Sequence, residues 1–148
     1  MATNAQNYTA TIVVAKPPHD VFKSLSDVSK WWGGKDLEGS TTRLGDEFTI
    51  THGDVHYSKQ RMVELIPDQK IAWLITESRL AWLERDKHEW TNTRLVFEIT
   101  PNGDGAVLRF THEGLVPGNE CYARCADGWN TAIKDWLFRF ITDGTAHF

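Results

Sequence analysis

The sequence has few of the features that would place it in a special class of protein. Two cysteines, Cys121 and Cys125, are too few for a disulfide-stabilised scaffold. No apolar run approaches the roughly 20 residues that a membrane-spanning helix needs. The polar start, MATNAQNYTAT, lacks the basic and apolar regions of a signal peptide. We therefore expect a cytoplasmic protein that does not cross a membrane.

An excess of positive charge is also missing. The chain has 16 Lys and Arg residues against 20 Asp and Glu residues, a formal net charge of −4, and no long basic run. A nucleic-acid-binding surface needs clustered cations that neutralise phosphates, so nucleic acid is not an expected partner. No G-x-S-x-G elbow, P-loop or dinucleotide glycine fingerprint is present. Covalent catalysis and nucleotide chemistry therefore have no support in the sequence.

Tryptophan, in contrast, is abundant, with seven residues in a chain of 148. Each is a large apolar body with one hydrogen-bond donor that needs a partner when buried. Two of them stand together in the motif Trp31-Trp32-Gly33-Gly34. Consecutive helical residues diverge by about 100°, so the two indoles are expected in different environments. Trp32 continues an apolar stripe that begins at Val21 and should be core, whereas Trp31 should face a cavity mouth or a partner.

Hydrophobic periodicity divides the chain into a strand at 8–15, two short helices, about six strands in hairpins, and a long helix from Asn119 to about Ile141. A meander of antiparallel strands has one face to bury. Only the last helix is long enough to cover that face. The predicted fold class is α+β, with a curved antiparallel sheet of about six or seven strands wrapped around a long C-terminal helix. The length predicts a single domain over residues 1–148.

Five features in this order carry a resemblance to a known family: Lys16-Pro17-Pro18, Val21-Phe22, Trp31-Trp32-Gly33, the VELIPDQKIAW hairpin from Val63 to Trp73, and Gly128-Trp129. The chain resembles the START-like (SRPBCC, helix-grip) superfamily, and within it the branch named after the activator of a heat-shock-protein ATPase. The resemblance implies a cavity between sheet and long helix, in which members bind apolar small molecules and some cyclise or hydrate polyketides. The family has no universal catalytic constellation, so no catalytic residue is carried over, and no cofactor is expected.

Strand alternation predicts which side chains line such a cavity. The expected lining consists of Trp31, Trp73, Ile75, Glu77, Phe97, Ile99, Leu108, Phe110 and His112, with Tyr122, Trp129 and Ile133 from the helix. The strand from Val55 to Ile66 is ambiguous, since either phase places some charge inside. An alternative stays open, in which the aromatic side chains simply fill the space.

Glu77 and His112 are polar residues that continue otherwise apolar inward faces. Converging polar groups orient a ligand in an apolar pocket, and a neighbouring carboxylate and imidazole also suit acid–base chemistry. In the alternative interpretation both residues lie at strand ends in solvent.

Two other pairs of residues are weaker candidates for a functional site. The first is His52 and His56, considered as metal ligands. A two-residue turn at Gly53-Asp54 would place His52 opposite Val55 and direct His56 to the other side of the sheet. Zinc also needs three or four ligands, so no metal site is expected. Cys121 and Cys125 share a helical face, where buried hydrophobic thiols are favoured over a reactive pair.

These observations leave three functional hypotheses. The first is a binding protein, without an evident catalytic function, for a small apolar or aromatic ligand. The second is an interaction module that acts like a chaperone-ATPase activator in a stress response, with an exposed patch around Trp82, Trp90 or Trp31. The third is a cyclase- or dehydratase-like enzyme that uses Glu77 and His112. A homodimer formed through the stretch from Arg79 to Trp90 is a further expectation about partners.

Overall fold

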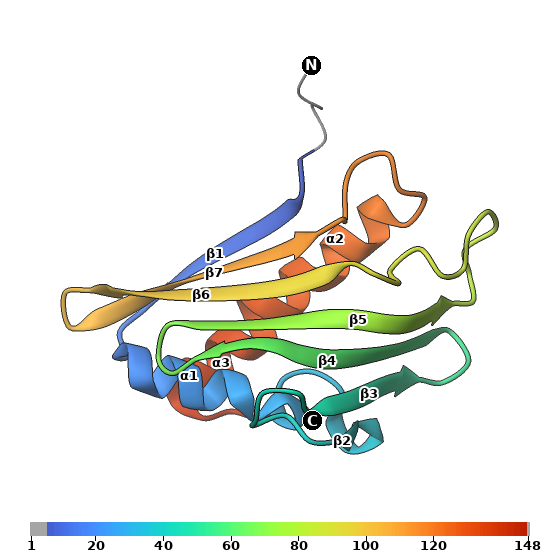
Figure 1. Ribbon diagram of the computed structural model, residues 1–148. Coiled ribbons are helices and arrows are strands. Elements are labelled where there is room, and N and C mark those ends of the chain that lie inside the picture. Colours follow the sequence, from blue (N-terminus) through green and yellow to red (C-terminus); the bar gives the residue numbers. More distant parts are fainter. Residues whose placement is uncertain (1–5, 148) are drawn as a thin grey trace.

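The computed structural model describes residues 6–147, which form one antiparallel sheet and a C-terminal helix that crosses it (Figure 1). Residues 1–5, which begin the polar segment judged not to be a signal peptide, lie outside the described residues, as does residue 148. The sheet has seven strands in the order β1-β7-β6-β5-β4-β3-β2. They are β1 (Tyr8–Val14), β2 (Glu38–Gly39), β3 (Glu47–His52), β4 (His56–Ile66), β5 (Lys70–Leu80), β6 (Arg94–Asn102) and β7 (Gly105–Glu113).

Short helices follow the first strand, as predicted. They are α1 (Pro18–Ser26), the 3-10 turn η1 (Val28–Lys30) and the 3-10 turn η2 (Gly34–Asp36). The C-terminal helix consists of α2 (Tyr122–Thr131), a π-helical segment η3 (Ala132–Leu137) and α3 (Phe138–Asp143). It begins at Tyr122 and not at Asn119 as predicted, because Asn119 closes the preceding turn, where its side chain accepts a hydrogen bond from the Val116 amide at 2.7 Å. The predicted α+β helix-grip fold is confirmed.

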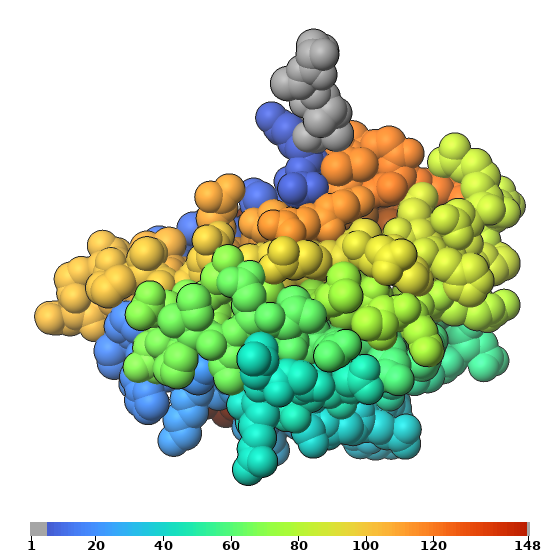
Figure 2. All heavy atoms as spheres, in the orientation of Figure 1, coloured from blue at the N-terminus to red at the C-terminus, as the bar shows by residue number. Residues whose placement is uncertain are grey.

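The sheet has an outer and an inner face. Figure 2 shows the outer face, where strands β4 to β6 (green and yellow) form a continuous surface in front of the C-terminal helix.

Within residues 6–147, no helix combines the length and the hydrophobicity needed to cross a membrane.

Most of the inward positions predicted from alternation are buried between sheet and helix. The side chains of Trp73, Ile75, Phe97, Leu108, Phe110, His112 and Ile133 have no exposed surface, and Ile99 and Trp129 are nearly covered. They pack on one another: the rings of Trp73 and Phe97 have their centroids 4.9 Å apart. The ambiguous strand β4 turns Ser58, Gln60 and Met62 inward, so it places no charge in the core. Much of the space between sheet and helix is therefore filled by aromatic side chains.

Glu77 does not face inward, and that prediction is wrong. Ile75 pairs with Gln60 on β4, whereas Glu77 pairs with Lys59, so Thr76 is the extra residue of a β-bulge. The bulge shifts the alternation by one residue and turns Glu77 to the outer, exposed face. There its carboxylate accepts a hydrogen bond from the Tyr57 hydroxyl at 2.9 Å.

The tryptophan pair is also arranged differently from the prediction for Trp31. Trp31 is completely buried, and its indole N–H donates to the Leu25 carbonyl at 3.2 Å. The 100° rule does not apply, because η1 ends at Lys30 and both tryptophans lie beyond it. Their rings instead stack with centroids 6.1 Å apart. Trp32 is core, as predicted, but it also reaches the wall of a pocket.

The hairpin between β3 and β4 differs by one residue from the predicted register. The turn at Gly53-Asp54 is present, with the Val55 amide bonded to the His52 carbonyl at 3.2 Å. Val55, however, is looped out, and His52 pairs with His56. The two imidazoles therefore lie on the same face, with ring centroids 5.6 Å apart, and the prediction that His56 points away from His52 is wrong.

Candidate functional site: an aromatic pocket

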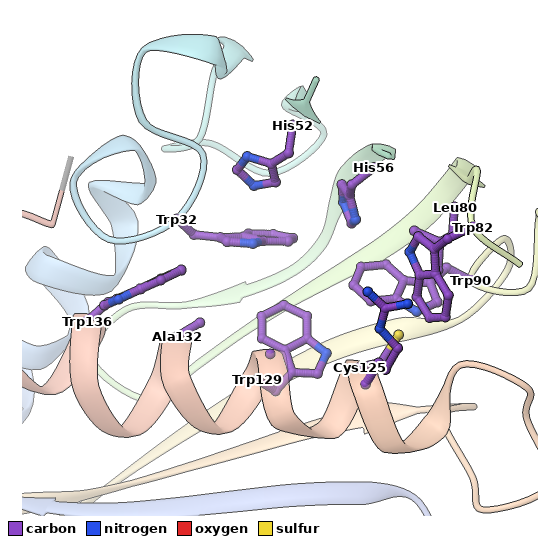
Figure 3. Close-up of a pocket in the computed structure, with 12 residues that line it drawn as sticks. Trp32, His52, His56, Leu80, Trp82, Trp90, Cys125, Trp129, Ala132 and Trp136 are labelled. Atoms are coloured by element: carbon purple, nitrogen blue, oxygen red, sulfur yellow. The ribbon is translucent and has the colours of Figure 1, made fainter. Parts of the chain in front are cut away.

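A pocket of about 270 Å³ lies between the C-terminal helix and the β3–β4 hairpin (Figure 3). The volume is near the lower end of the usual range for small-molecule sites, about 300–1,000 Å³. The hairpin contributes His52 and His56, and the helix contributes Arg124, Cys125, Gly128, Trp129, Ala132 and Trp136. Trp32 comes from the turn after α1, and the end of β5 and the following loop supply Leu80, Trp82 and Trp90. We call this site the aromatic pocket.

Three buried tryptophans form its floor. Trp90 and Trp129 stack almost parallel, with ring centroids 5.7 Å apart and an interplanar angle of 11°. Trp32 is tilted against Trp129 at 5.0 Å. Each has 6% or less of its surface exposed. Their remaining exposed surface gives the pocket an apolar, aromatic floor.

The rim consists of half-exposed and exposed side chains. Trp82 and Trp136 are half-buried, and the Arg124 guanidinium carbon lies 4.3 Å from the centroid of the Trp82 ring. Trp136 stacks on His147 with ring centroids 4.0 Å apart. Trp136 and Ala132 belong to the π-helical segment, and such segments occur frequently at functional sites.

Two histidines from the hairpin close the side opposite the helix. The His56 ring meets Trp90 edge to face, with centroids 5.1 Å apart, and its Nε2 lies 3.0 Å from the Ser58 hydroxyl. Burial, together with the neighbouring His52, lowers the pKa of His56 to about 4. His56 is therefore a neutral polar group at neutral pH.

A hydrogen-bonded chain fixes the floor from below. The Trp129 indole N–H donates to His112 Nδ1 at 3.0 Å, and His112 Nε2 lies 2.8 Å from the Thr93 hydroxyl oxygen. The same hydroxyl donates to the Trp90 carbonyl. Burial lowers the pKa of His112 to about 3. Both ring nitrogens are engaged, so His112 acts as a neutral structural link and not as a free base.

The loop at 81–93, between β5 and β6, is fastened to the start of the helix by two glutamates. The Glu89 carboxylate accepts hydrogen bonds from the amides of Glu120 and Cys121, at 2.9 and 3.1 Å. The Glu120 carboxylate accepts in return from the amides of Glu84 and Arg85. We call this reciprocal pair the glutamate clasp. It holds Trp82 and Trp90 over the helix and so completes the pocket.

Of the residues predicted to line a ligand cavity, only Trp129 lines the aromatic pocket. Most of the others belong to the packed core behind it, Tyr122 is half-buried, and Glu77 lies on the outer face. Sequence reasoning missed the contribution of Trp82 and Trp90 because they lie in a charged, irregular stretch. Two tryptophans in such a loop were a usable signal, since indoles of that size require cover.

The hypothetical acid–base pair of Glu77 and His112 is not formed. Glu77 is exposed on the outer face of β5, whereas His112 is buried on the inner face of β7, with β6 between the two strands. The cyclase-like mechanism that needed these side chains side by side is therefore excluded.

The structure offers neither a metal site nor a reactive thiol at the other candidate pairs in the described residues. No three His, Cys, Asp or Glu side chains in residues 6–147 are grouped in a way that could hold a metal ion. Cys121 and Cys125 are both buried and unoxidised. A hydrogen bond with Cys125, together with burial, raises the pKa of the Cys121 thiol far above its usual range.

Comparisons with solved structures agree with the fold. The chain is similar to the Aha1 dimer from Colwellia psychrerythraea, with a TM-score of 0.76 and 18% identity over 95% of this chain and 99% of that one. It is also similar to CalU16 from Micromonospora echinospora (TM-score 0.67, 15% identity, 94% and 78% covered). DynU16, a protein of the dynemicin biosynthetic locus, matches with a TM-score of 0.68 and 15% identity over 95% of this chain and 48% of that one.

No individual curated protein matches the sequence. The family comparison is more informative, because residues 15–140 match the family described as activator of Hsp90 ATPase homolog 1-like protein. This match spans most of the chain and agrees with the helix-grip architecture. The protein therefore belongs to the activator of Hsp90 ATPase homolog 1-like family, within the START-like (SRPBCC) superfamily.

Proposed function

We propose that this protein binds a small, flat, apolar molecule, aromatic in character, in the aromatic pocket. The observation that carries the proposal is a pocket of about 270 Å³ whose floor is made of three tryptophan rings. Apolar burial supplies about 25 cal/mol per Å² before the costs of association. Contact with aromatic rings adds a directional preference for a planar, aromatic ligand.

The geometry of the pocket also favours binding because hydrogen bonds within the protein hold its walls in place. The chain from Trp129 through His112 and Thr93 holds the two stacked tryptophans, and the glutamate clasp holds the loop above them. A preformed site loses little conformational entropy on binding. The polar groups around the pocket, Arg124 and the two histidines, would orient the ligand.

Gly128 offers a direct test. It lines the pocket in α2, and a Cβ added there meets no atom within 4 Å apart from its chain neighbours and the adjacent helix backbone. Gly128→Leu should block the pocket while stabilising the helix by up to about 1 kcal/mol. Ala123→Leu is the matched control, since Ala123 is exposed on the same helix and does not line the pocket.

The experiment is a calorimetric titration with a neutral bicyclic probe, 2-naphthamide, and with any compound released from the purified protein by solvent extraction and identified by mass spectrometry. Binding to the parent and to Ala123→Leu, but not to Gly128→Leu, would support the proposal. No binding to the parent, or undiminished binding to Gly128→Leu, would contradict it.

A second proposal concerns protein partners. The similar Aha1 of Colwellia psychrerythraea is a dimer, and the family is named after an activator of the Hsp90 ATPase. We propose on this basis that the chain self-associates or acts on a chaperone. Of the tryptophans suggested for an exposed patch, Trp31 and Trp90 are buried, so Trp82 is left as the anchor. Sedimentation equilibrium and the Hsp90 ATPase rate, each with Trp82→Ala, test this proposal; a monomer that leaves the rate unchanged contradicts it.

A further inference from the structure

The guanidinium of Arg124 lies at the rim of the aromatic pocket without an acidic partner. Other arginines form ion pairs: Arg85 with Glu120, Arg94 with Glu64 and Glu113, and Arg139 with Asp135. In the described part of the chain, Arg124 has no ion pair and no hydrogen bond, only its stacking contact with Trp82. Its planar face rests on an indole, so its five N–H donors remain available to a ligand.

The two carboxylates of the glutamate clasp, which lie closest to the start of the helix, are already engaged. Glu120, just before the helix, accepts hydrogen bonds from the Glu84 and Arg85 amides. Glu89 accepts from the first amides of the helix. Both carboxylates therefore fasten the loop to the helix and do not pair with Arg124. Neither of them lines the pocket.

The charge of the pocket is consequently one-sided. Its lining includes one arginine and two histidines, and no aspartate or glutamate. An aromatic pocket of this kind would otherwise suit a quaternary ammonium group. A cation at this site, however, would meet the Arg124 charge with no counter-ion, whereas an anion would meet an unpaired guanidinium.

From this arrangement we propose that the aromatic pocket selects flat aromatic molecules that carry an anionic group, aromatic carboxylates in particular. The ring system would lie on the floor formed by Trp32, Trp90 and Trp129, and the carboxylate would face Arg124. A guanidinium and a carboxylate match in geometry and can form two parallel hydrogen bonds. This assignment of ligand class rests on the proposed function of the pocket.

The test compares 2-naphthoate with its neutral isostere 2-naphthamide by isothermal titration at neutral pH and low ionic strength. The parent should bind the carboxylate about tenfold more tightly than the amide, which is the effect expected of one charge-assisted hydrogen-bonding partner. Arg124→Gln should remove this preference and leave the affinity for the amide within about twofold. Added salt should weaken only the binding of 2-naphthoate, because the rim is open to solvent.

Arg109→Gln is the control for a change in net charge, since Arg109 is exposed on β7 and does not line the pocket. It should leave both affinities as in the parent. Gly128→Leu should abolish the binding of both probes and so locate them in the aromatic pocket.

The outcomes separate the two proposals. Equal binding of both probes by the parent and by Arg124→Gln would overturn the assignment of an anionic ligand and leave the proposed binding function standing. Binding of neither probe would overturn the binding function and this inference with it. A preference for 2-naphthoate that persists in Gly128→Leu would show that the anion binds elsewhere, which also overturns the inference.

Discussion

Trp129 and His112 join the C-terminal helix to strand β7 directly beneath the aromatic pocket. The indole N–H donates to Nδ1 of the imidazole at 3.0 Å. Because the Thr93 hydroxyl donates to the Trp90 carbonyl, its oxygen accepts from His112, which places the single ring proton on Nε2. If Nδ1 were protonated, its N–H would face the Trp129 indole N–H, and two donors would lie together in a buried site without an acceptor. The hydrogen bond therefore requires a neutral histidine.

The first prediction is that folding stability falls as the pH is lowered below about 6.5. Burial lowers the pKa of His112 to about 3, and burial with the neighbouring His52 lowers that of His56 to about 4, both from 6.5. Between these values the unfolded chain binds more protons than the folded one. The contribution is therefore fully present above pH 6.5 and is lost on acidification, by about 1.4 kcal/mol per pH unit for each fully shifted histidine.

His112→Asn isolates this effect, since the asparagine amide oxygen takes the place of Nδ1 as the acceptor from Trp129 but does not titrate. Urea unfolding measured from pH 7.5 to 4.5 should show a shallower pH slope for the variant than for the parent. Parallel slopes would contradict the assignment of a neutral buried His112.

The second prediction concerns the pocket floor. Trp129→Ala should lower the free energy of unfolding by about 3–5 kcal/mol, because it opens a cavity and leaves His112 Nδ1 without its donor. Trp82→Ala, at the half-exposed rim, is the comparison and should cost clearly less. Urea denaturation of both variants gives the two values; equal losses would show that Trp129 is not the core residue described.

The third prediction concerns the glutamate clasp. Glu89→Ala removes the carboxylate that accepts from the first amides of the helix, so it should cost about 1 kcal/mol, as loss of a helix cap does. Hydrogen exchange should become faster at residues 81–93 and at the helix start. Glu84→Ala is the control, since this exposed residue contributes only its backbone amide, which the substitution keeps. Unchanged exchange in Glu89→Ala would mean that the clasp does not hold the loop.

The fourth prediction is that Cys121 does not react with a thiol-specific dye in the folded protein. Its thiol is fully buried, and its hydrogen bond with Cys125 and its burial both disfavour the thiolate that reacts. A Cys125→Ser variant carries Cys121 as its only thiol and allows a direct measurement. Labelling is expected only after denaturation; rapid labelling of the native variant would contradict the prediction.

The sequence by itself determined the fold class, the strands and most of the buried residues. These features follow from local periodicity: alternation places Phe97 and Phe110 inward, and spacings of three and four place Trp129 and Ile133 on one helical face. Such patterns depend on neighbours a few residues away, so they can be read without knowledge of the rest of the chain.

Only the tertiary structure decided where the pocket lies and what lines it. One extra residue at Thr76 turned Glu77 outward, and one looped-out Val55 brought His56 beside His52. The loop that carries Trp82 and Trp90 has no periodicity of its own and is positioned by Glu89 and Glu120 across the fold. Irregularities of a single residue and contacts between distant segments leave no periodic signal, so they emerge only when the whole chain has packed.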